Sequence, residues 1–352
     1  MNKIAAFGAH SATRPLEPMV IERRSPEQKD VVIEILYCGV CHSDLHSTRN
    51  DWGGTSYPVV PGHEIVGRVT SVGNAVSKYA IGDTVAVGCL VDSCRHCESC
   101  ADDLEQYCEA GLVGTYGSPD PKHNNEITKG GYSTQIVVDQ HFVLRVPSNL
   151  DLKAAAPLLC AGITSWSPLS YWGVGKGDTV GVIGLGGIGH MGVKFAHAMG
   201  ANVVMISTSP AKAQDAKRLG ADEVLISSDG DAMQQWQSKF DFLLDTIPVD
   251  HDINPYISLL KRDGTMAMVG AFGQLPEPLI TGPLVMQRRR ITGSIIGGLK
   301  ETQQMLDFCS EHNIVSDVEV INMQQINDAY ERMLQNDIKY RFVIDMASLK
   351  ES

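Results

Sequence analysis

The sequence has no long hydrophobic run, no broad basic stretch and no internal repeat or low-complexity tract. Apolar segments such as 152–163 and 180–188 are shorter than the roughly 20 residues that span a bilayer, so we expect no transmembrane helix. The chain has 29 Lys and Arg against 41 Asp and Glu, a formal charge of −12, and its one basic cluster is 288–290. We therefore expect no binding surface for nucleic acid or an anionic membrane.

The N-terminal residues 1–8 lack the apolar core of a secretory signal and lead directly into a strand-like segment, which predicts a cytoplasmic protein. The chain has nine cysteines, an odd number, and four of them fall within 94–108. In a reducing compartment, this crowding favours thiolate ligands of a metal over disulfides.

Length and sequence pattern predict two domains, because 352 residues exceed the roughly 150 of one ordinary domain. In the first part, β-branched runs alternate with Gly, Pro, Asn and Asp, which predicts an irregular β-rich domain with strands at 31–36, 64–72, 83–87 and 135–146. Near Asp151 the pattern changes to alternating strands and helices, which predicts a doubly wound parallel sheet. Its strands are expected at 180–183, 202–206, 223–226, 240–244, 264–269 and 290–294.

A glycine-rich turn follows the first of these strands and opens a helix. A dinucleotide fingerprint requires this context, because glycines let the backbone approach a pyrophosphate at a helix N-terminus. A glycine-rich turn without a ligand is the alternative. The turn consists of Gly184, Leu185, Gly186, Gly187, Ile188 and Gly189.

Residues about 20 positions further on distinguish NADP(H) from NAD(H). An acid there would bind the adenosine ribose and repel a 2′-phosphate, but the chain has Ser207, Thr208 and Ser209, then Lys212, and no acid before position 215. Three hydroxyls and a cation suit a phosphate, so we predict NADP(H). In the alternative, the two serines only cap the helix that Pro210 begins.

Four cysteines in one short segment predict a structural zinc site. Four thiolates form the closed tetrahedral set of such a site, with sulfur about 2.3 Å from the metal. Disulfides or free thiols are the alternative. The ligands are Cys94, Cys97, Cys100 and Cys108, in a lobe of residues 89–115.

A second candidate set is dispersed along the chain. Cys41, His63 and Cys160 would supply three ligands and leave one position open, the arrangement of the catalytic zinc in alcohol dehydrogenase. Taken singly, the two cysteines could equally be buried, unreactive thiols.

Together these motifs resemble the zinc-dependent medium-chain dehydrogenase/reductase (alcohol dehydrogenase) family along essentially the whole chain. Within the family, the chain is similar to the cinnamyl-alcohol-dehydrogenase branch and most similar to its bacterial, broad-specificity NADPH-dependent aldehyde reductases. The resemblance implies an α/β fold in which residues 1–160 and 296–352 form a GroES-like β-rich catalytic domain and residues 161–295 form a Rossmann domain. It rests on segments 39–46, 62–67, 157–164, 184–190, 207–209, 262–265 and 293–298 and on the four-cysteine lobe.

The resemblance also implies a reaction, the reversible NADPH-linked reduction of aldehydes to primary alcohols, with the carbonyl oxygen on a catalytic zinc. Glu64 would lie behind this metal as an occasional ligand, and Asp44 would orient His63. Ser43 would hydrogen-bond the alkoxide and pass its proton through the nicotinamide ribose to His46.

For the cofactor, the resemblance implies that His42 and Arg341 face the pyrophosphate and that Thr164 packs beside the nicotinamide ring. His42 stands where many relatives carry Arg, and a neutral imidazole would weaken that contact. The carboxamide would be held by the backbone of Val269, Ala271, Ser294, Ile295 and Ile296.

Trp52 follows the first ligand segment and is a candidate wall of an apolar substrate pocket, with Tyr57, Leu90, Ile295 and Leu299 as further candidates. Trp52 and Tyr57 could equally be ordinary core residues. Aromatic residues are only 6% of the chain, so composition does not identify the aldehyde. The resemblance also implies a homodimer that pairs through an edge strand near 290–295.

The nearest alternative function is an NAD-linked zinc alcohol or polyol dehydrogenase working in the oxidative direction, which would need an acid at position 208. A zinc-free quinone or enoyl reductase of the same fold would lack both ligand sets. A zinc-ribbon interaction protein leaves the glycine-rich turn unexplained. A noncatalytic nucleotide sensor would bind NADPH without turnover.

Overall fold

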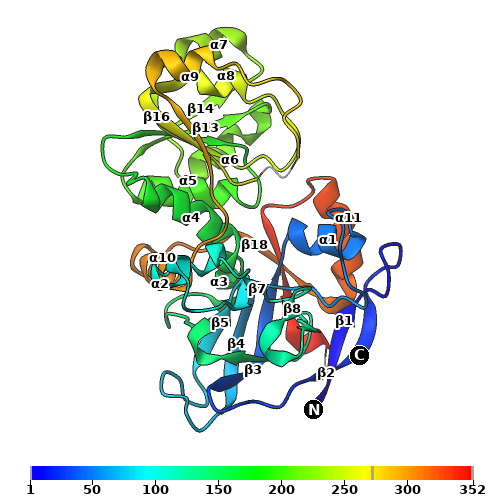
Figure 1. The fold of residues 1–352 in the computed structure, drawn as a ribbon. Coiled ribbons are helices and arrows are strands. Elements are labelled where there is room, and N and C mark those ends of the chain that lie inside the picture. The colour runs from blue at the N-terminus through cyan, green and yellow to red at the C-terminus, as the bar shows by residue number, and fades with distance from the viewer. Residues whose placement is uncertain (1, 271–272, 350–352) are drawn as a thin grey trace. The chain divides into compact units, whose positions relative to one another are not determined.

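The computed structural model describes residues 2–270 and 273–349, and Figure 1 shows its helices and strands. The chain divides into two compact units. One consists of Met1–Cys160 and Gly297–Ser352, and the other is Ala161–Ile296. Among the described residues, no helix is both long enough and apolar enough to cross a membrane.

A seven-stranded sheet is the centre of the first unit. Strand β3 pairs antiparallel with β4, β10 and β19, and the sheet order is β11-β5-β4-β3-β19-β18, with β10 also on β3. Because β18 and β19 come from the end of the chain, both parts of the sequence complete one sheet. The strands are β3 (Asp30–Val40), β4 (Ile65–Val72), β5 (Thr84–Val87), β10 (Gln135–Asp139), β11 (Leu144–Arg145), β18 (Val318–Asn322) and β19 (Arg341–Asp345).

Shorter elements surround this sheet. β1 (Asn2–Gly8) pairs with β2 (Glu17–Arg23), β6 (Leu90–Asp92) with β7 (Val113–Gly114), and β8 (Pro119–Asp120) with β9 (Glu126–Ile127). The helices are α1 (His42–Arg49), α2 (Glu98–Ala101), α3 (Leu152–Ala155), α10 (Leu299–His312) and α11 (Ile326–Leu334), and short 3-10 turns include η1 (Glu105–Tyr107) and η4 (Ala156–Leu159).

Two details of the first unit differ from the sequence prediction. The strand predicted at 135–146 is split by a 3-10 turn, η3 (Gln140–Phe142), because the Asp139 side chain accepts a hydrogen bond from the His141 N–H and caps the turn. The unit also continues past Asp151, where the sequence pattern changes, and ends at Cys160, the bound that the family resemblance implied. Helix α3, just after Asp151, packs against β3, β4, β18 and β19 and so belongs to the first unit.

The second unit is a parallel sheet of six strands. Its order, β14-β13-β12-β15-β16-β17, has its first strand, β12, beside its fourth, β15. This arrangement is the Rossmann order, and the crevice outside the carboxyl ends of β12 and β15 is its usual ligand site. The strands are β12 (Thr179–Ile183), β13 (Asn202–Ser207), β14 (Glu223–Ile226), β15 (Phe240–Asp245), β16 (Leu260–Met268) and β17 (Arg290–Gly293).

Helices cover both faces of this parallel sheet. Gly192 of α5 approaches Val182 and Leu244, whereas their neighbours Ile183 and Leu243 belong to an apolar core that includes Ile257. Because neighbouring side chains on a strand point to opposite faces, the sheet is buried on both. The helices are α4 (Ala161–Tyr171), α5 (Gly189–Ala198), α6 (Ala213–Leu219), α7 (Gly230–Gln235), α8 (Asn254–Ile257) and α9 (Gly282–Gln287).

One strand of the second unit is longer than predicted. β16 begins at Leu260 and not at Gly264, because Leu260 pairs with Phe240 ahead of an irregularity in the register.

Candidate metal and dinucleotide sites

The first unit gathers the dispersed ligands in one place. Cys41 lies between β3 and α1, His63 and Glu64 directly precede β4, and Cys160 follows η4. Their ligand atoms all lie within 4.8 Å of one another, and all four residues are buried. The sulfurs of Cys41 and Cys160 are 3.9 Å apart. Two thiols and an imidazole in a dry site, with a carboxylate beside them, suit zinc.

Asp44 fixes two of these ligand segments. One carboxylate oxygen lies 3.0 Å from His63 Nδ1 and accepts the Gly62 N–H at 3.0 Å. The other accepts the Cys41 N–H at 2.9 Å and the Tyr132 hydroxyl at 3.4 Å. Because Nδ1 faces Asp44, Nε2 is the ring nitrogen left for a metal, as predicted for an acid that orients a ligand.

The two carboxylate oxygens of Glu64 lie in different environments. Its Oε1 pairs with the guanidinium of Arg341, which is 4% exposed. Its buried Oε2 has no hydrogen-bond partner among the residues that the structure describes. A Cβ on residue 39 would lie 1.8 Å from this oxygen, so only glycine at that position leaves it room. Burial raises the pKa of Glu64 to about 7, although Arg341 opposes the shift. An unsatisfied buried carboxylate oxygen beside three ligands fits an occasional metal ligand.

One thiol of the set favours the thiolate form. The hydrogen bond with Cys160 lowers the pKa of Cys41 well below its usual value, and the charge of Arg341 contributes although burial opposes it. A thiolate is the form that binds metal.

The predicted relay residues lie on α1, directly after Cys41. Ser43 Oγ is 3.6 Å from Cys41 Sγ. His46 lies one turn further along the helix, and its Nδ1 is 2.8 Å from the Asp51 carboxylate. Asp51 therefore leaves Nε2 of His46 as the nitrogen that can exchange a proton. The sequence did not predict the roles of Asp51 and Gly39, because no spacing pattern points to either residue.

The four-cysteine lobe forms the second ligand set. The Sγ atoms of Cys94, Cys97, Cys100 and Cys108 lie within 4.8 Å of one another. Hydrogen bonds from the main-chain N–H groups of His96 and Cys97 lower the pKa of Cys94 to about 6, and burial raises that of Cys100 to about 12. Four converging sulfurs and no other ligand type fit a closed, structural zinc site.

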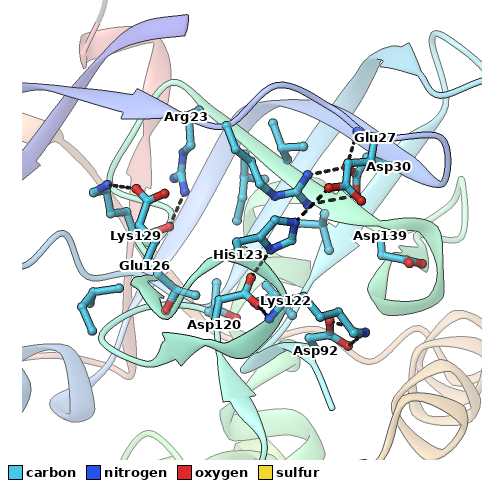
Figure 2. Close-up of a pocket in the computed structure, with 18 of the residues that line it drawn as sticks. Arg23, Glu27, Asp30, Asp92, Asp120, Lys122, His123, Glu126, Lys129 and Asp139 are labelled. Carbon is cyan, nitrogen blue, oxygen red and sulfur yellow. Dashed lines mark hydrogen bonds and ion pairs between the residues drawn. The ribbon is translucent and has the colours of Figure 1, made fainter. Parts of the chain in front are cut away.

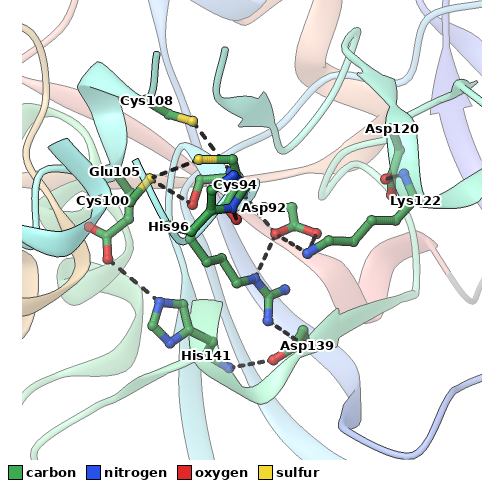
Figure 3. A network of polar contacts seen from close by, with 12 residues as sticks. Asp92, Cys94, His96, Cys100, Glu105, Cys108, Asp120, Lys122, Asp139 and His141 are labelled. Atoms are coloured by element: carbon green, nitrogen blue, oxygen red, sulfur yellow. Dashed lines mark hydrogen bonds and ion pairs between the residues drawn. The ribbon is translucent and has the colours of Figure 1, made fainter. Parts of the chain in front are cut away.

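Ion pairs join this lobe to neighbouring segments of the first unit, as Figure 3 shows. Arg95, between two of the cysteines, donates to Asp92 at 2.9 Å and to Asp139 at 2.8 Å. Lys122 also pairs with Asp92, at 2.6 Å.

The glycine-rich turn lies at the carboxyl end of β12, at the point where the order of the strands reverses. Helix α5 begins at Gly189, where a Cβ would lie 2.0 Å from the Gly184 carbonyl oxygen. By contrast, a Cβ on Gly186 would meet no described residue within 4 Å. The turn thus needs glycine at 189 for its own packing and leaves open space at 186, where a pyrophosphate could approach.

The three hydroxyl residues and the lysine that are predicted to bind the 2′-phosphate lie at the end of β13 and after it. Ser207 is buried and its Oγ accepts the Ser209 N–H at 3.1 Å, while Thr208 is exposed. Lys212 donates to the carbonyl of Leu185 at 3.1 Å, so its charge lies beside the glycine-rich turn. The nearest acid, Asp215, is paired with Arg218 at 2.7 Å.

The other predicted cofactor residues fall in both units. Thr164 and Val269 are buried, Ser294 and Ile296 are half-buried, and Ile295 is exposed. Ala271 lies outside the described residues.

His42 and Arg341 belong to the first unit. Burial lowers the pKa of His42, although the Cys41 thiolate opposes the shift, so the imidazole is neutral at pH 7. Arg341 is engaged by Glu64, and its predicted contact with a pyrophosphate stays a prediction.

The candidate pocket residues of the first unit differ in environment. Trp52 is 52% exposed, and its ring centroid lies 5.3 Å from that of His46. Tyr57 donates its hydroxyl to the Thr48 carbonyl at 2.8 Å, which fits a structural role. Leu90 is buried, and Leu299 is half-buried.

Figure 2 shows a different, charged pocket in the first unit. None of the predicted metal ligands lines it. The guanidinium of Arg23 donates hydrogen bonds to the carbonyls of Gln135, Lys129 and Gly130 and to the Ser133 hydroxyl. Eight other charged or titratable side chains of the lining form ion pairs: Arg24 with Asp30, Lys122 with Asp92, His123 with Asp120 and Lys129 with Glu126. Because these charged side chains pair with one another, the pocket fits a structural role.

Comparison with known proteins agrees with this geometry. Residues 27–148 match the alcohol dehydrogenase GroES-like domain, and residues 187–311 match the zinc-binding dehydrogenase family. The chain is 57% identical over 350 residues to the aldehyde reductase YahK of Escherichia coli, covering 99% of this chain and 100% of that protein.

Two solved structures extend the likeness to the whole fold. A cinnamyl alcohol dehydrogenase of Sorghum bicolor is 45% identical, with a TM-score of 0.94 and 98% of both chains covered. An enzyme of the same kind from Helicobacter pylori, solved with NADP(H), is 41% identical, with a TM-score of 0.90 and 98% of both chains covered. The resemblance seen in the sequence motifs is confirmed: the chain belongs to the zinc-binding alcohol dehydrogenases of the medium-chain dehydrogenase/reductase family, in the cinnamyl-alcohol-dehydrogenase branch.

Proposed function

We propose that this protein is a zinc-dependent, NADP(H)-linked oxidoreductase that reduces aldehydes to primary alcohols. The observation that carries the proposal is the convergence of Cys41, His63 and Cys160 in a buried site. Three protein ligands leave a position open for substrate. Bound there, zinc would supply Lewis-acid polarisation of a carbonyl, and the nicotinamide would supply a hydride.

The chain's own residues would then manage the proton. We infer that Ser43, whose Oγ lies beside the ligand sulfur of Cys41, donates to the substrate oxygen. His46 would replace that proton by way of the nicotinamide ribose, and Asp51 orients its ring. Ser43→Ala should depress kcat far more than it weakens NADPH binding. Loss of NADPH affinity with normal turnover would contradict this relay.

Selectivity for NADP(H) would come from Ser207, Thr208, Ser209 and Lys212. The cation lies beside the turn, and no acid occupies 207–214, so nothing there would repel a 2′-phosphate. The decisive experiment is the initial rate with NADPH and with NADH against aliphatic and aromatic aldehydes. We expect faster turnover with NADPH, and Thr208→Asp should shift the preference toward NADH. Faster turnover of the unaltered enzyme with NADH would favour the polyol-dehydrogenase alternative.

We further propose a cytoplasmic homodimer formed through the edge of the six-stranded sheet. β17 is an edge strand, and α9, just before it, exposes Val285 and Met286, which are 78% and 80% accessible. An exposed apolar helix beside an open strand edge is typical of an interface. Light scattering after size exclusion should give twice the chain mass, and Met286→Glu should shift the population toward monomer.

A further inference from the structure

The return segment, residues 296–299, leads the chain back into the first unit and begins with an unusual backbone conformation. Ile296 has a φ of +40°, a left-handed conformation that is strained for a β-branched residue. Gly297 and Gly298 follow, and α10 begins at Leu299. Strain of this kind persists only where the surrounding structure fixes the backbone.

Glu105 fixes the start of α10. Its Oε2 accepts a hydrogen bond from the Leu299 N–H at 3.1 Å, one of the helix amides that have no partner within the helix. The N-cap residue, Gly298, has no side chain that could do so. Glu105 is only 3% exposed, and its Oε1 lies 3.5 Å from His141 Nε2 (Figure 3).

The charge of Glu105 suits this role. Burial raises the pKa of the carboxyl group, but hydrogen bonds from His141 and from the Leu299 N–H outweigh that effect, and the pKa lies below its usual value. A carboxylate at a helix N-terminus also interacts favourably with the helix dipole.

The return segment packs directly on the four-cysteine lobe. A Cβ on Gly298 would lie 1.9 Å from the Asp103 carbonyl oxygen and 2.9 Å from Glu105 Oε2. Glu105 is itself linked to a zinc-ligand candidate, because its carbonyl accepts the Cys108 N–H at 3.1 Å. The loop between Cys100 and Cys108 therefore contacts the return segment with both backbone and side chain.

We propose that Glu105 is a positioning residue that ties the backbone following Ile296 to the four-cysteine lobe, and that the lobe thereby contributes to cofactor binding. The chain joins this anchor directly to Ser294–Ile296, which are predicted to hold the nicotinamide carboxamide. A zinc in the lobe would hold Cys100 and Cys108 and, with them, the loop that carries Glu105. The part concerning NADPH rests on the proposed function.

The test compares Glu105→Ala with Asp103→Asn in the zinc-loaded enzyme. Asp103 is the matched control, because it lies on the same loop as Glu105 and its side chain reaches α10 through an exposed ion pair with Lys300, at 2.7 Å. Exposed ion pairs contribute little to stability. Glu105→Ala should speed hydrogen exchange in peptides covering 297–303 and raise the dissociation constant and the KM for NADPH roughly tenfold, the size expected for a lost charged hydrogen bond. We expect kcat to change by less than about twofold and the zinc content to stay at two per chain, whereas Asp103→Asn should change none of these quantities.

Glu105→Gln supplies a second variant, since it keeps an oxygen that can accept the Leu299 N–H. It should lie between the unaltered enzyme and Glu105→Ala in both exchange rate and NADPH affinity, and it decides the question if Glu105→Ala does not fold. Unchanged exchange at 297–303, or unchanged NADPH affinity in an enzyme that binds NADPH, would overturn the proposal. If the unaltered enzyme does not bind NADPH, the proposed function fails and so does the lobe's part in cofactor binding, while hydrogen exchange still decides the anchoring.

Discussion

The two metal-ligand sets of the first unit are built in opposite ways. The lobe draws Cys94, Cys97, Cys100 and Cys108 from one short loop, and two of these residues are only half-buried. The other set draws its ligands from the end of β3, from the start of β4 and from position 160, and all of them are buried. A local set can form whenever its loop closes around a metal, whereas the dispersed set exists only after the sheet has folded.

The difference teaches where chemistry and stability are located. The dispersed set has three ligands, a carboxylate with an unsatisfied oxygen and an acid, Asp44, that bonds two ligand segments. Such an arrangement is suited to holding an open coordination position. The four sulfurs of the lobe leave no such position. Its side chains Arg95 and Glu105 instead bond residues outside it, Asp139 and Leu299.

The largest effect is expected from Cys160→Ser. Removing one of three ligands should reduce aldehyde turnover on the order of a thousandfold or more, because Lewis-acid stabilisation is worth several kcal/mol. Metal analysis should find one zinc per chain, and circular dichroism should report an intact fold. Two zinc ions retained with normal turnover would break the distinction between the two sets.

Cys97→Ser in the lobe should reduce stability more than it reduces turnover. We expect a loss of stability of several kcal/mol, because structural zinc contributes directly to folding free energy. Urea unfolding and metal analysis check this, with Cys160→Ser as the matched comparison. A stability equal to that of the unaltered enzyme would show that ion pairs such as Arg95 with Asp139 hold the lobe without metal.

The dinucleotide turn is a third site, local like the lobe but built from backbone. Gly189→Ala places a Cβ against the Gly184 carbonyl oxygen, so it should lower the melting temperature even without cofactor and weaken NADPH binding roughly tenfold or more. Gly186→Ala, which meets open space, should weaken NADPH binding and leave the melting temperature unchanged. Fluorescence titration and calorimetry separate the two, and normal NADPH binding by Gly186→Ala would contradict this geometry.

The smallest effect concerns a pair formed by a histidine and a buried aspartate, which occurs in each unit. His63 lies 3.0 Å from Asp44 at the metal site, and His251 lies 3.0 Å from Asp245 in the second unit. Hydrogen bonding to Asp245 raises the pKa of His251 above 6.5. The pair's stabilisation is therefore complete below pH 6.5 and is lost as the pH rises through the folded-state pKa.

His251→Gln keeps a hydrogen-bond donor without the charge, so it isolates the contribution of the His251 charge to stability. The difference in unfolding free energy between the two proteins should be on the order of 1 kcal/mol near pH 6 and should shrink toward pH 9. Urea unfolding at several pH values measures it. A difference that does not vary with pH would show that the charge of His251 contributes nothing.

The motifs whose chemistry the sequence predicts most directly are local ones. The four cysteines, the glycine-rich turn after β12 and the segment from Ser207 to Lys212 each depend on neighbours within a few residues, so spacing alone predicts their chemistry. The family assignment followed from the same motifs and is confirmed. The change of pattern near Asp151 precedes the end of the first unit at Cys160, the bound that the family resemblance implied.

Contacts between distant segments decided the rest. Glu64 with Arg341, the space that Gly39 leaves for Glu64, and Glu105 with Leu299 each join positions with no common spacing pattern. Sequence determined the donors and the backbone turns, because these are properties of residue type and local conformation. Tertiary structure alone decided which donors meet, which are buried and which charge each of them faces, because burial and distance arise only when the sheet brings remote segments together.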